Sequence, residues 1–238
     1  MLKRVLLKLS GEQFAGKDKF GIDADFLNKL AIELAEVTGA THAQIAIVVG
    51  GGNFLRGAAL ANKQIERATA DYMGMLATVM NGMALVDVLE SNGQPARLQT
   101  RVQVNTVAEP YIRRRAIRHL EKGRVVIVAG GTGNPFVTTD TASVMTALEL
   151  DCEMVLKATK VDGVYNKDPH KHKSAQKIDH VSYLEALQNS EINVMDNSAI
   201  SLAMDHHLPI VVFDLLTHGN IERIVRGEKV GTILSHEI

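Results

Sequence analysis

Short apolar runs alternate with longer amphipathic segments along most of this 238-residue chain. The runs are unbroken and rich in Val, Ile and Leu, which is typical of strands that are buried on both faces of a sheet. We predict strands over Val5 to Leu9, Ile45 to Val49, Pro95 to Leu98, Val125 to Ala129, Met154 to Lys157, Pro209 to Phe213 and Val230 to Leu234.

The segments between these runs carry apolar residues three and four positions apart, which predicts helices. We expect them from Asp23 to near Gly39, over Asp71 to Glu90, over Glu109 to Leu120, after Asp140, from Asp196 to His207, and over Asn220 to Val225. Strands that alternate with helices predict an α/β fold, a three-layer αβα sandwich around a central, mostly parallel sheet. No internal repeat or low-complexity linker divides the chain, so we expect a single domain.

Composition narrows the function classes. A net charge of −1 argues against a general nucleic-acid or membrane-surface binder, and the absence of Trp argues against base-stacking platforms. No unbroken apolar stretch approaches the roughly 20 residues of a membrane span. The N-terminus has the basic start of a signal peptide, but Lys8 interrupts its apolar run and no small-residue cleavage site follows. The single cysteine, Cys152, fits a structural role in a reducing compartment. We therefore expect a soluble, cytoplasmic protein.

The segment from 124 to 146 contains the first candidate site. Gly130-Gly131 ends a buried strand, and Thr138 to Asp140 lie just before apolar residues at helical spacing, where a helix N-cap is expected. Backbone N–H groups gathered at such a point suit an anion, most often a phosphate. For a single loop of this kind, an ordinary capped connection would be the better interpretation. Further glycine- and lysine-bearing strand ends in this chain favour the phosphate site.

A second loop of this type follows the strand that ends at Val49. Gly50 to Gly52 leave the backbone bare, so another group can approach it closely. Arg56 follows four residues later, and its guanidinium could bind the same phosphate. Gly11 to Lys17 also nearly match the P-loop pattern. Asp18, however, replaces the hydroxyl that magnesium needs, and we reject that match.

Lysines stand at the ends of two further strands. Lys8 and Lys157 are both at carboxyl ends, where ligands of parallel α/β sheets bind, and Thr159 follows. Asp71, at the start of a long apolar segment, could present a carboxylate to ligand hydroxyls. Cations and amide-rich loops at one sheet edge suit phosphoryl transfer, whose catalysis is mainly positioning and charge neutralisation. If the acceptor is itself an ionised phosphate, no general base is needed.

Other patterns are weaker. The run Arg113 to Arg115 is expected on a solvated or subunit-facing surface. His170 and His172 alone are too few for a metal site. Asp162-Gly163 indicates a turn or hairpin.

Seven segments carry a family resemblance: VLLKLSGE (Val5 to Glu12), VVGGGNFLRG (Val48 to Gly57), DYMGMLATVMNG (Asp71 to Gly82), GTGNPFVTTD (Gly131 to Asp140), LKATKVDGVY (Leu156 to Tyr165), NVMD (Asn193 to Asp196) and GEKVGT (Gly227 to Thr232). In these segments, and in order over essentially its whole length, the chain resembles the bacterial UMP kinases of the amino-acid-kinase family. The resemblance implies the amino-acid-kinase fold and the reaction UMP + ATP giving UDP + ADP, with Mg²⁺ carried on the ATP phosphates.

The resemblance also implies a role for each matching residue. The ATP side would comprise Lys8, Leu9, Ser10, Gly11, Gly52, Arg56, Thr159, Lys160, Tyr165 and Asp168. The UMP side would comprise Gly51, Asp71, Thr132, Gly133, Asn134, Pro135, Phe136, Val137, Thr138 and Thr139, with Asp71 accepting from the ribose hydroxyls. The catalytic set would be Lys8, Arg56, Asp140 and Asp196, the two aspartates orienting lysines and magnesium waters. The acceptor side would lie within about residues 1–150 and the ATP side within about 151–238. No separate protein-held metal site is implied.

The resemblance further implies a homohexamer built from dimers, consistent with the apolar segment Asp71 to Glu90. GTP activates and UTP inhibits many bacterial members. The segment Gly16 to Gly21 matches where a regulatory contact lies in some of them, and Arg101 and the Arg113 to Arg115 run are candidates for that interface.

Three alternative functions can be weighed against the sequence. An enzyme of the same fold that phosphorylates a carboxylate should lack GTGNPFVTTD. A non-catalytic nucleotide sensor should have lost Lys8, Arg56 or Asp140, and all three are present. A Rossmann dehydrogenase would need Gly-x-Gly-x-x-Gly after the first strand, which this chain does not have.

Overall fold

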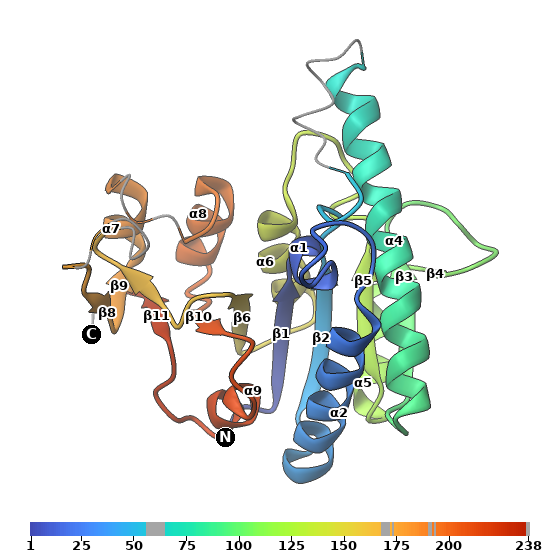
Figure 1. Cartoon of the computed structure of the whole chain (residues 1–238), viewed down its shortest axis with the longest axis horizontal. Helices are drawn as coiled ribbons and strands as arrows, with labels where there is room; N and C mark the ends of the chain where they lie inside the picture. Colours follow the sequence, from blue (N-terminus) through green and yellow to red (C-terminus); the bar gives the residue numbers. More distant parts are fainter. Residues whose placement is uncertain (56–64, 168–171, 173, 190–191, 193, 237–238) are drawn as a thin grey trace.

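The computed structural model describes residues 1–55, 65–167, 172, 174–189, 192 and 194–236. Among these residues, one sheet of nine strands runs through the molecule in the order β4-β3-β5-β2-β1-β6-β10-β11-β9 (Figure 1). The strands are β1 (Arg4–Leu9), β2 (Gln44–Val49), β3 (Ala96–Thr100), β4 (Glu109–Pro110), β5 (Val125–Ala129), β6 (Met154–Thr159), β9 (His180–Ser182), β10 (Ile210–Asp214) and β11 (Thr232–Ser235). A separate pair, β7 (Val164–Tyr165) and β8 (Lys177–Ile178), is antiparallel.

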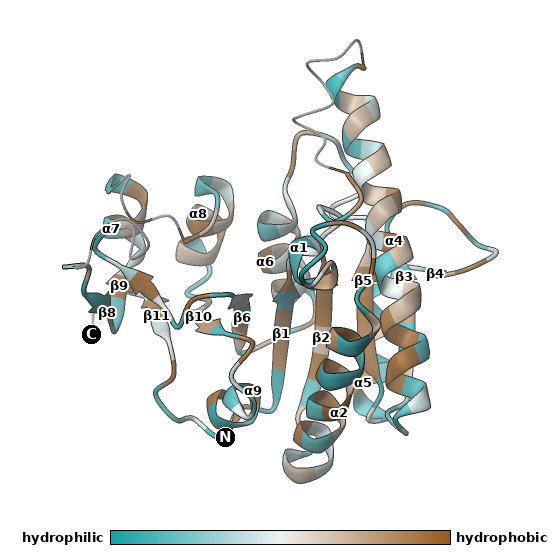
Figure 2. Cartoon of the chain, viewed as in Figure 1, coloured by the Kyte–Doolittle hydropathy of each residue, from teal (hydrophilic) through white to brown (hydrophobic). Residues whose placement is uncertain are grey.

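The nine-stranded sheet is mostly parallel, as the sequence predicts. Within it, β10 and β11 form the antiparallel pair, and each other pairing is parallel. The central strands β2 and β5 are brown along most of their length in Figure 2, because they are buried on both faces. Parallel strands end at the same edge of a sheet, so the residues that follow β1, β2, β5 and β6 meet there.

Helices cover both faces of the sheet. They are α1 (Gly11–Phe14), α2 (Ala24–Thr41), α4 (Arg67–Ser91), α5 (Arg113–Glu121), α6 (Thr139–Glu149), α7 (Tyr183–Gln188), α8 (Asn197–Asp205) and α9 (Asn220–Val225). Side chains of α2, α4 and α9 share one apolar core with the strands, and those of α5 to α8 share a second core on the opposite face. This arrangement is the expected three-layer sandwich.

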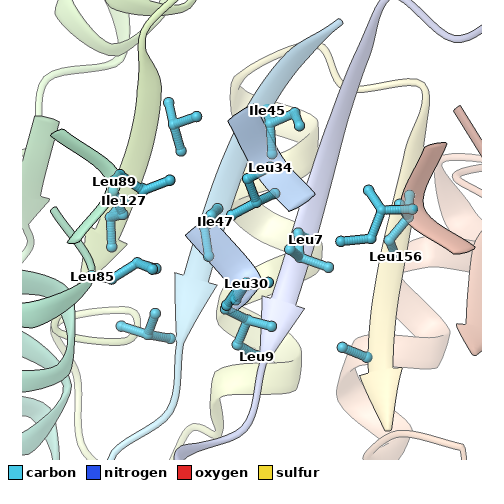
Figure 3. Packing of buried hydrophobic residues seen from close by; sticks show 14 of the residues in the cluster. Leu7, Leu9, Leu30, Leu34, Ile45, Ile47, Leu85, Leu89, Ile127 and Leu156 are labelled. Carbon is cyan, nitrogen blue, oxygen red and sulfur yellow. The ribbon is translucent and has the colours of Figure 1, made fainter. Parts of the chain in front are cut away.

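The core beneath α2 and α4 is built from aliphatic side chains. Leu30 and Leu34 of α2 lie over β1 and β2, beside Leu7 (Figure 3). Leu85 of α4 lies near Ile127 of β5, and all five side chains are buried. Burying one such side chain stabilises the fold by about 1.5–3 kcal/mol, so this layer holds β1 and β2 rigid. The loops at the ends of those strands therefore start from fixed points.

Several element boundaries differ from the sequence prediction. Helix α4 begins at Arg67, so Asp71 lies one turn inside the helix and not at its start. Helix α5 begins at Arg113 because Glu109 and Pro110 form the short strand β4. A residue that precedes proline is disfavoured in a helix, and the sequence contained that signal. The last strand begins at Thr232 and not at Val230.

The segment after β6 also differs. Asp162-Gly163 lies just before β7, but β7 pairs with β8 and not with β6, so this turn does not close a hairpin. Five elements, α1, β7, β8, β9 and α7, were not predicted from the sequence. These elements are short, with six residues or fewer, and their sequences give little periodicity.

Among the described residues, α4 is the one helix long and apolar enough to cross a membrane by length and composition. It contains no unbroken apolar stretch of that length, because polar residues such as Thr78 and Asn81 interrupt the helix. Its inner side chains, such as Leu85 and Leu89, are fully buried in the core over β3 and β5. We therefore describe α4 as a core helix.

Candidate active site

Lys8 and Lys157 stand side by side at the carboxyl ends of β1 and β6, where they are register partners on adjacent parallel strands. Asp140, in the first turn of α6, lies between their ammonium groups. Lys8 Nζ is 2.7 Å from Oδ1 of Asp140, and Lys157 Nζ is 3.0 Å from Oδ2. Two cations share one anion, so this cluster carries a net positive charge that suits phosphate oxygens.

The pKa of Asp140 lies below its ordinary value. Burial alone would raise that pKa, but the charges of Lys8 and Lys157 outweigh the burial. Burial is the largest influence on Lys157 and lowers the pKa of its ammonium group, against the opposing effect of Asp140. A carboxylate with a lowered pKa is a weak base, so Asp140 is suited to orienting the two lysines and not to accepting a proton.

Asp196 joins α8 to the start of α6. Its side chain accepts the N–H of Ala199 at 2.8 Å, which caps α8, and the hydroxyl of Thr141 at 2.9 Å. It also accepts a hydrogen bond from the hydroxyl of Thr138. The charge of Asp196 raises the pKa of Lys157, although it is not the largest influence. The structure thus brings Asp196 close to the lysine cluster, but its direct partners are two hydroxyls and one backbone N–H.

The first glycine loop (residues 50–52) follows β2 and packs directly on the start of α1. Gly50 N donates to the carbonyl oxygen of Leu9 at 2.8 Å. A Cβ atom on Gly11 would lie 2.2 Å from Gly52 N, so only glycine fits at position 11. Leu9 itself is fully buried, and its side chain points into the core. Of Leu9, therefore, the backbone and not the side chain is placed to contact a ligand.

The loop of residues 130–139, which we call the acceptor loop after the role that the sequence predicts for it, follows β5 and, with the first glycine loop, borders a cavity of about 210 Å³. The cavity is lined by Gly51, Gly52, Leu55, Arg67, Ala70, Asp71, Gly74, Met75, Thr78, Gly131, Val137, Thr138 and Thr139. Five of the residues expected on the UMP side, Gly51, Asp71, Val137, Thr138 and Thr139, therefore meet at one cavity. Asp140 follows Thr139 directly, so the lysine cluster adjoins the lining.

Asp71 lies on α4 at the cavity and already has two partners. Nε of Arg67 donates to both carboxylate oxygens of Asp71, at 2.8 and 2.9 Å. The backbone N–H of Phe136 donates to Oδ2 of Asp71 at 2.8 Å. Phe136 has a left-handed backbone, with φ of 68°, and its exposed ring lies near the guanidinium of Arg67. Asp71 thus holds the acceptor loop through Phe136.

The remaining acceptor-loop residues form a polar turn at the surface. Asn134 N donates to the hydroxyl oxygen of Thr132 at 3.3 Å, and Gly133 N donates to the carbonyl of Gly130 at 2.8 Å. Pro135 follows in the same exposed turn. These residues are not part of the cavity lining, although the sequence predicted them on the UMP side.

The residues expected on the ATP side are more dispersed. The hydroxyl of Thr159 donates to the carbonyls of Val161 and Phe213. Tyr165 donates to Asp162 at 2.6 Å, and Lys160 is exposed beside this turn. No contact within the described part of the chain joins Thr159, Lys160 or Tyr165 to Lys8. Two of the predicted residues, Arg56 and Asp168, lie outside the described residues.

Comparison with known proteins identifies the family. A family model for the amino acid kinase family matches residues 3–214.

The chain belongs to the amino acid kinase family.

Three solved structures are similar to this chain over essentially its whole length. A UMP kinase from Bacillus anthracis is 39% identical with a TM-score of 0.94, and the alignment covers 100% of this chain and 97% of that one. A UMP kinase from Ureaplasma parvum is 29% identical, with a TM-score of 0.90 and 99% coverage of both chains. A uridylate kinase from Archaeoglobus fulgidus is 26% identical, with a TM-score of 0.74, over 99% of this chain and 100% of that one.

Three polar residues near the cavity and the lysine cluster, Lys157, Arg67 and Thr78, are not in the predicted catalytic or binding sets. The sequence predicted Lys157 at a strand end but not in the catalytic set. Because the carboxyl ends of parallel strands meet, a place for Lys157 beside Lys8 could have been predicted, and the two residues are register partners. Arg67 and Thr78 both line the cavity. Arg67 stands four residues before Asp71, which is the spacing of a helical ion pair, so a signal for it existed. Nothing in the local pattern distinguished Thr78.

Other candidate groups lie apart from the cavity of this amino acid kinase. Arg113 to Arg115 are exposed, as expected, whereas Arg101 is mostly buried against Glu149 at 2.5 Å. Cys152 is buried, and burial raises its pKa to about 12, which suits a structural thiol. His172 is exposed, and His170 lies outside the described residues. No group of three His, Cys, Asp or Glu side chains that could hold a metal ion occurs in the described ranges.

Proposed function

We propose that this protein transfers the γ-phosphoryl group of ATP to UMP, giving UDP and ADP. The observation that carries this proposal is the adjacency of the cavity, with Asp71 and Thr138 in its lining, to the Lys8–Asp140–Lys157 cluster. The full-length likeness to two UMP kinases, at 39% and 29% identity, supports UMP as the acceptor.

The proposed reaction needs positioning and positive charge. A phosphate oxygen of UMP attacks the γ-phosphorus of ATP, a new P–O bond forms, and the bond from that phosphorus to the β–γ bridging oxygen breaks. Lys8 and Lys157 stabilise the negative charge on the transferring group and on the departing ADP. The attacking oxygen is already ionised, so no side chain has to remove a proton from it. Asp140 keeps both ammonium groups in place.

The two nucleotides would occupy opposite sides of the lysine cluster. On the UMP side, Gly51 and the residues from Thr132 to Thr139 would contact the nucleotide, and Asp71 would accept from its ribose hydroxyls. We propose that the backbone of residues 9–11 and Gly52 binds the phosphates of ATP. The residues around its nucleoside would be Thr159, Lys160, Tyr165 and Asp168, the last of which lies outside the described residues. Arg56 would bridge the phosphates. In this proposal the UMP site lies within about residues 1–150, and residues within about 151–238 surround the nucleoside of ATP, whose phosphates also contact residues 9–11 and Gly52.

Magnesium fits this site as a companion of ATP. Asp140 is already neutralised by two lysines, and Asp196 is engaged by hydroxyls, so neither forms a ready-made cage for the ion. Mg²⁺ commonly binds through nucleotide phosphates and few carboxylates. When bound, it would neutralise charge on the β- and γ-phosphate oxygens. Asp196 and Asp140 would then hold waters of its shell.

We also propose assembly and regulation in line with the bacterial UMP kinases. Four apolar side chains on the outer face of α4, Tyr72, Leu76, Met80 and Met83, are between 41% and 49% exposed. A contiguous apolar stripe on a helix commonly marks a subunit contact, and we propose that a second copy covers it in a homohexamer built from dimers. GTP as an activator, UTP as an inhibitor, a cytoplasmic location and a place in pyrimidine nucleotide biosynthesis complete the proposal.

A coupled assay of ADP release tests the proposed reaction. Magnesium-ATP is offered with UMP, CMP, AMP, aspartate or acetylglutamate in turn, each with and without GTP or UTP. Turnover with UMP supports the proposal, and the GTP and UTP lanes test regulation. Turnover with an amino acid would keep the family and overturn the acceptor. ATP binding without turnover in any lane would favour a nucleotide sensor.

A further inference from the structure

Helix α4 lies directly beneath the first glycine loop. A Cβ atom on Gly51 would be 2.6 Å from the carbonyl oxygen of Gly74, so the loop and the helix backbone are in contact. Two buried polar side chains of α4, Thr78 and Asn81, bond to the backbone of the two glycine-rich loops. We propose that Thr78 and Asn81 are positioning residues for phosphoryl transfer, Thr78 through the acceptor loop and Asn81 through the first glycine loop. The inference rests on the proposed function.

Thr78 fixes the point where the acceptor loop leaves β5. Gly130 N donates to Oγ1 of Thr78 at 2.7 Å, and the Thr78 hydroxyl donates to the carbonyl of Met75 at 2.6 Å. Because the hydroxyl proton is committed to Met75, a lone pair of the same oxygen faces Gly130. Gly130 has a φ of 81°, and a Cβ atom there would lie 2.9 Å from Val102 N. The loop is therefore held from the helix on one side and from the chain after β3 on the other.

Asn81 fixes the first glycine loop through a reciprocal amide pair. Nδ2 of Asn81 donates to the carbonyl of Gly50 at 2.7 Å and to Oδ1 of Asn53 at 2.7 Å. Asn53 Nδ2 donates back to Oδ1 of Asn81 at 2.9 Å, and to the carbonyl of Gly21 at 2.7 Å. Both side chains are at most 1% exposed. A buried network with each amide hydrogen engaged sets one geometry, because alternatives leave polar groups unpaired.

These contacts predict a different kinetic effect for each residue. The acceptor loop faces the UMP side, so removal of the Thr78 hydroxyl should raise the KM for UMP and leave the KM for ATP nearly unchanged. The first glycine loop is expected to contact UMP through Gly51 and ATP through Gly52. Removal of the Asn81 amide should therefore raise both KM values. A purely structural role would lower stability without this division between substrates.

The chain offers a close control for Thr78. Thr41, at the end of α2, is also buried; its hydroxyl donates to the carbonyl of Val37 at 2.6 Å and accepts Ala43 N at 3.2 Å. Like Thr78, it donates to a carbonyl of its own helix and accepts one backbone N–H, but it lies just before the amino end of β2, whereas the glycine loops follow the carboxyl ends of the strands. Thr41→Val and Thr78→Val each remove one such hydroxyl while keeping the side-chain volume.

The test compares Thr78→Val, Thr78→Ser, Asn81→Leu and Thr41→Val by steady-state kinetics and thermal unfolding. We expect Thr78→Val to raise the KM for UMP roughly tenfold to a hundredfold, the effect of leaving a buried N–H without its acceptor. Thr78→Ser should restore most of the wild-type KM. Thr41→Val should lower the unfolding temperature and leave both KM values unchanged. Equal KM values in Thr78→Val, Thr41→Val and wild type would overturn the role of Thr78.

Amide hydrogen exchange provides a readout that does not depend on the reaction. In the wild type, the Gly130 amide should exchange slowly, and Thr78→Val should accelerate it while Thr41→Val does not. Fast exchange at Gly130 in the wild type would overturn the inference even if Thr78→Val fails to fold. Wild-type protein with slow exchange at Gly130 but no turnover of UMP would instead contradict the proposed function.

Discussion

Lys8 and Lys157 are register partners on adjacent parallel strands, and their ammonium groups contact opposite oxygens of one carboxylate, that of Asp140. The parallel register brings two like charges to the same height at the sheet edge, which would be unfavourable without an anion between them. Asp140 supplies that anion from α6. A phosphoryl group that arrives at this point meets cations whose positions are already fixed.

Removal of Lys8 tests the charge argument. We expect Lys8→Ala to lower kcat about 10²–10³-fold, because one preorganised cation aimed at developing charge is worth several kcal/mol. Circular dichroism should show an intact fold, since Lys157 still pairs with Asp140. Lys3→Ala, at an exposed position of the same N-terminal segment, is the control and should be fully active. A near-normal kcat in Lys8→Ala would remove Lys8 from the mechanism.

Asp71 should discriminate between the two substrates. Asp71→Asn removes the charge of the carboxylate that accepts hydrogen bonds from Arg67 and Phe136. We expect the affinity for UMP to fall about tenfold or more, while the affinity for ATP stays within about twofold. Isothermal titration with each nucleotide measures both affinities. Asp87→Asn is the control, because Asp87 is an exposed aspartate of the same helix. Equal losses for UMP and ATP would mean that the acceptor site is misplaced.

Asp140 should make stability depend on acid pH. Its pKa in the folded protein lies below the unfolded value of 3.8, so the ion pairs contribute fully above that value and are lost as pH falls through the folded pKa. Denaturant unfolding of wild type and Asp140→Asn measures the difference in unfolding free energy. That difference should be constant from about pH 7 to pH 5 and shrink below about pH 4. A difference that is unchanged at about pH 3 would contradict this role.

The exposed face of α4 should control assembly. Met80, near the middle of the stripe, is 49% exposed, and Met80→Asp would place a charge in an apolar contact. We expect light scattering to show a smaller oligomer for this variant than for wild type. Ile32→Asp on α2, which is also partly exposed but lies off the stripe, should leave the mass unchanged. The same mass for all three proteins would show that α4 is not a subunit contact.

The strands of the central sheet were predictable because each is a continuous apolar run. Burial on both faces leaves no other arrangement for segments such as residues 125–129. The short elements after β6 were not predicted. Strands of two residues, such as β7 and β8, are specified by tertiary contacts and not by a local sequence pattern. Helix α4 was recognised but its start was not: the apolar spacing begins only after Asp71, whereas the helix begins at Arg67, where Arg67 and Asp71 form an i,i+4 ion pair.

The part of the candidate site that could be predicted consists of charged and glycine residues at the ends of predicted strands. Lys8 lies at the carboxyl end of a buried strand, two glycine-rich loops follow two others, and parallel strands end at the same edge of a sheet. The partners of these groups were not predictable. The contact between Thr78 and Gly130 joins residues 52 positions apart. The amide pair joins Asn53, next to a loop, to Asn81 of α4, 28 positions later, and no local sequence pattern links the two. Such pairings appear only once the layers are packed.

The most direct measurement follows the phosphorus atoms themselves. ³¹P nuclear magnetic resonance of the protein with magnesium-ATP and UMP should show the signals of ADP and of UDP growing at equal rates, and Lys8→Ala should slow both about 10²–10³-fold. ADP that forms together with inorganic phosphate and without UDP would contradict transfer to UMP. Unchanged ATP and UMP signals, from protein that binds both nucleotides, would contradict the account as a whole.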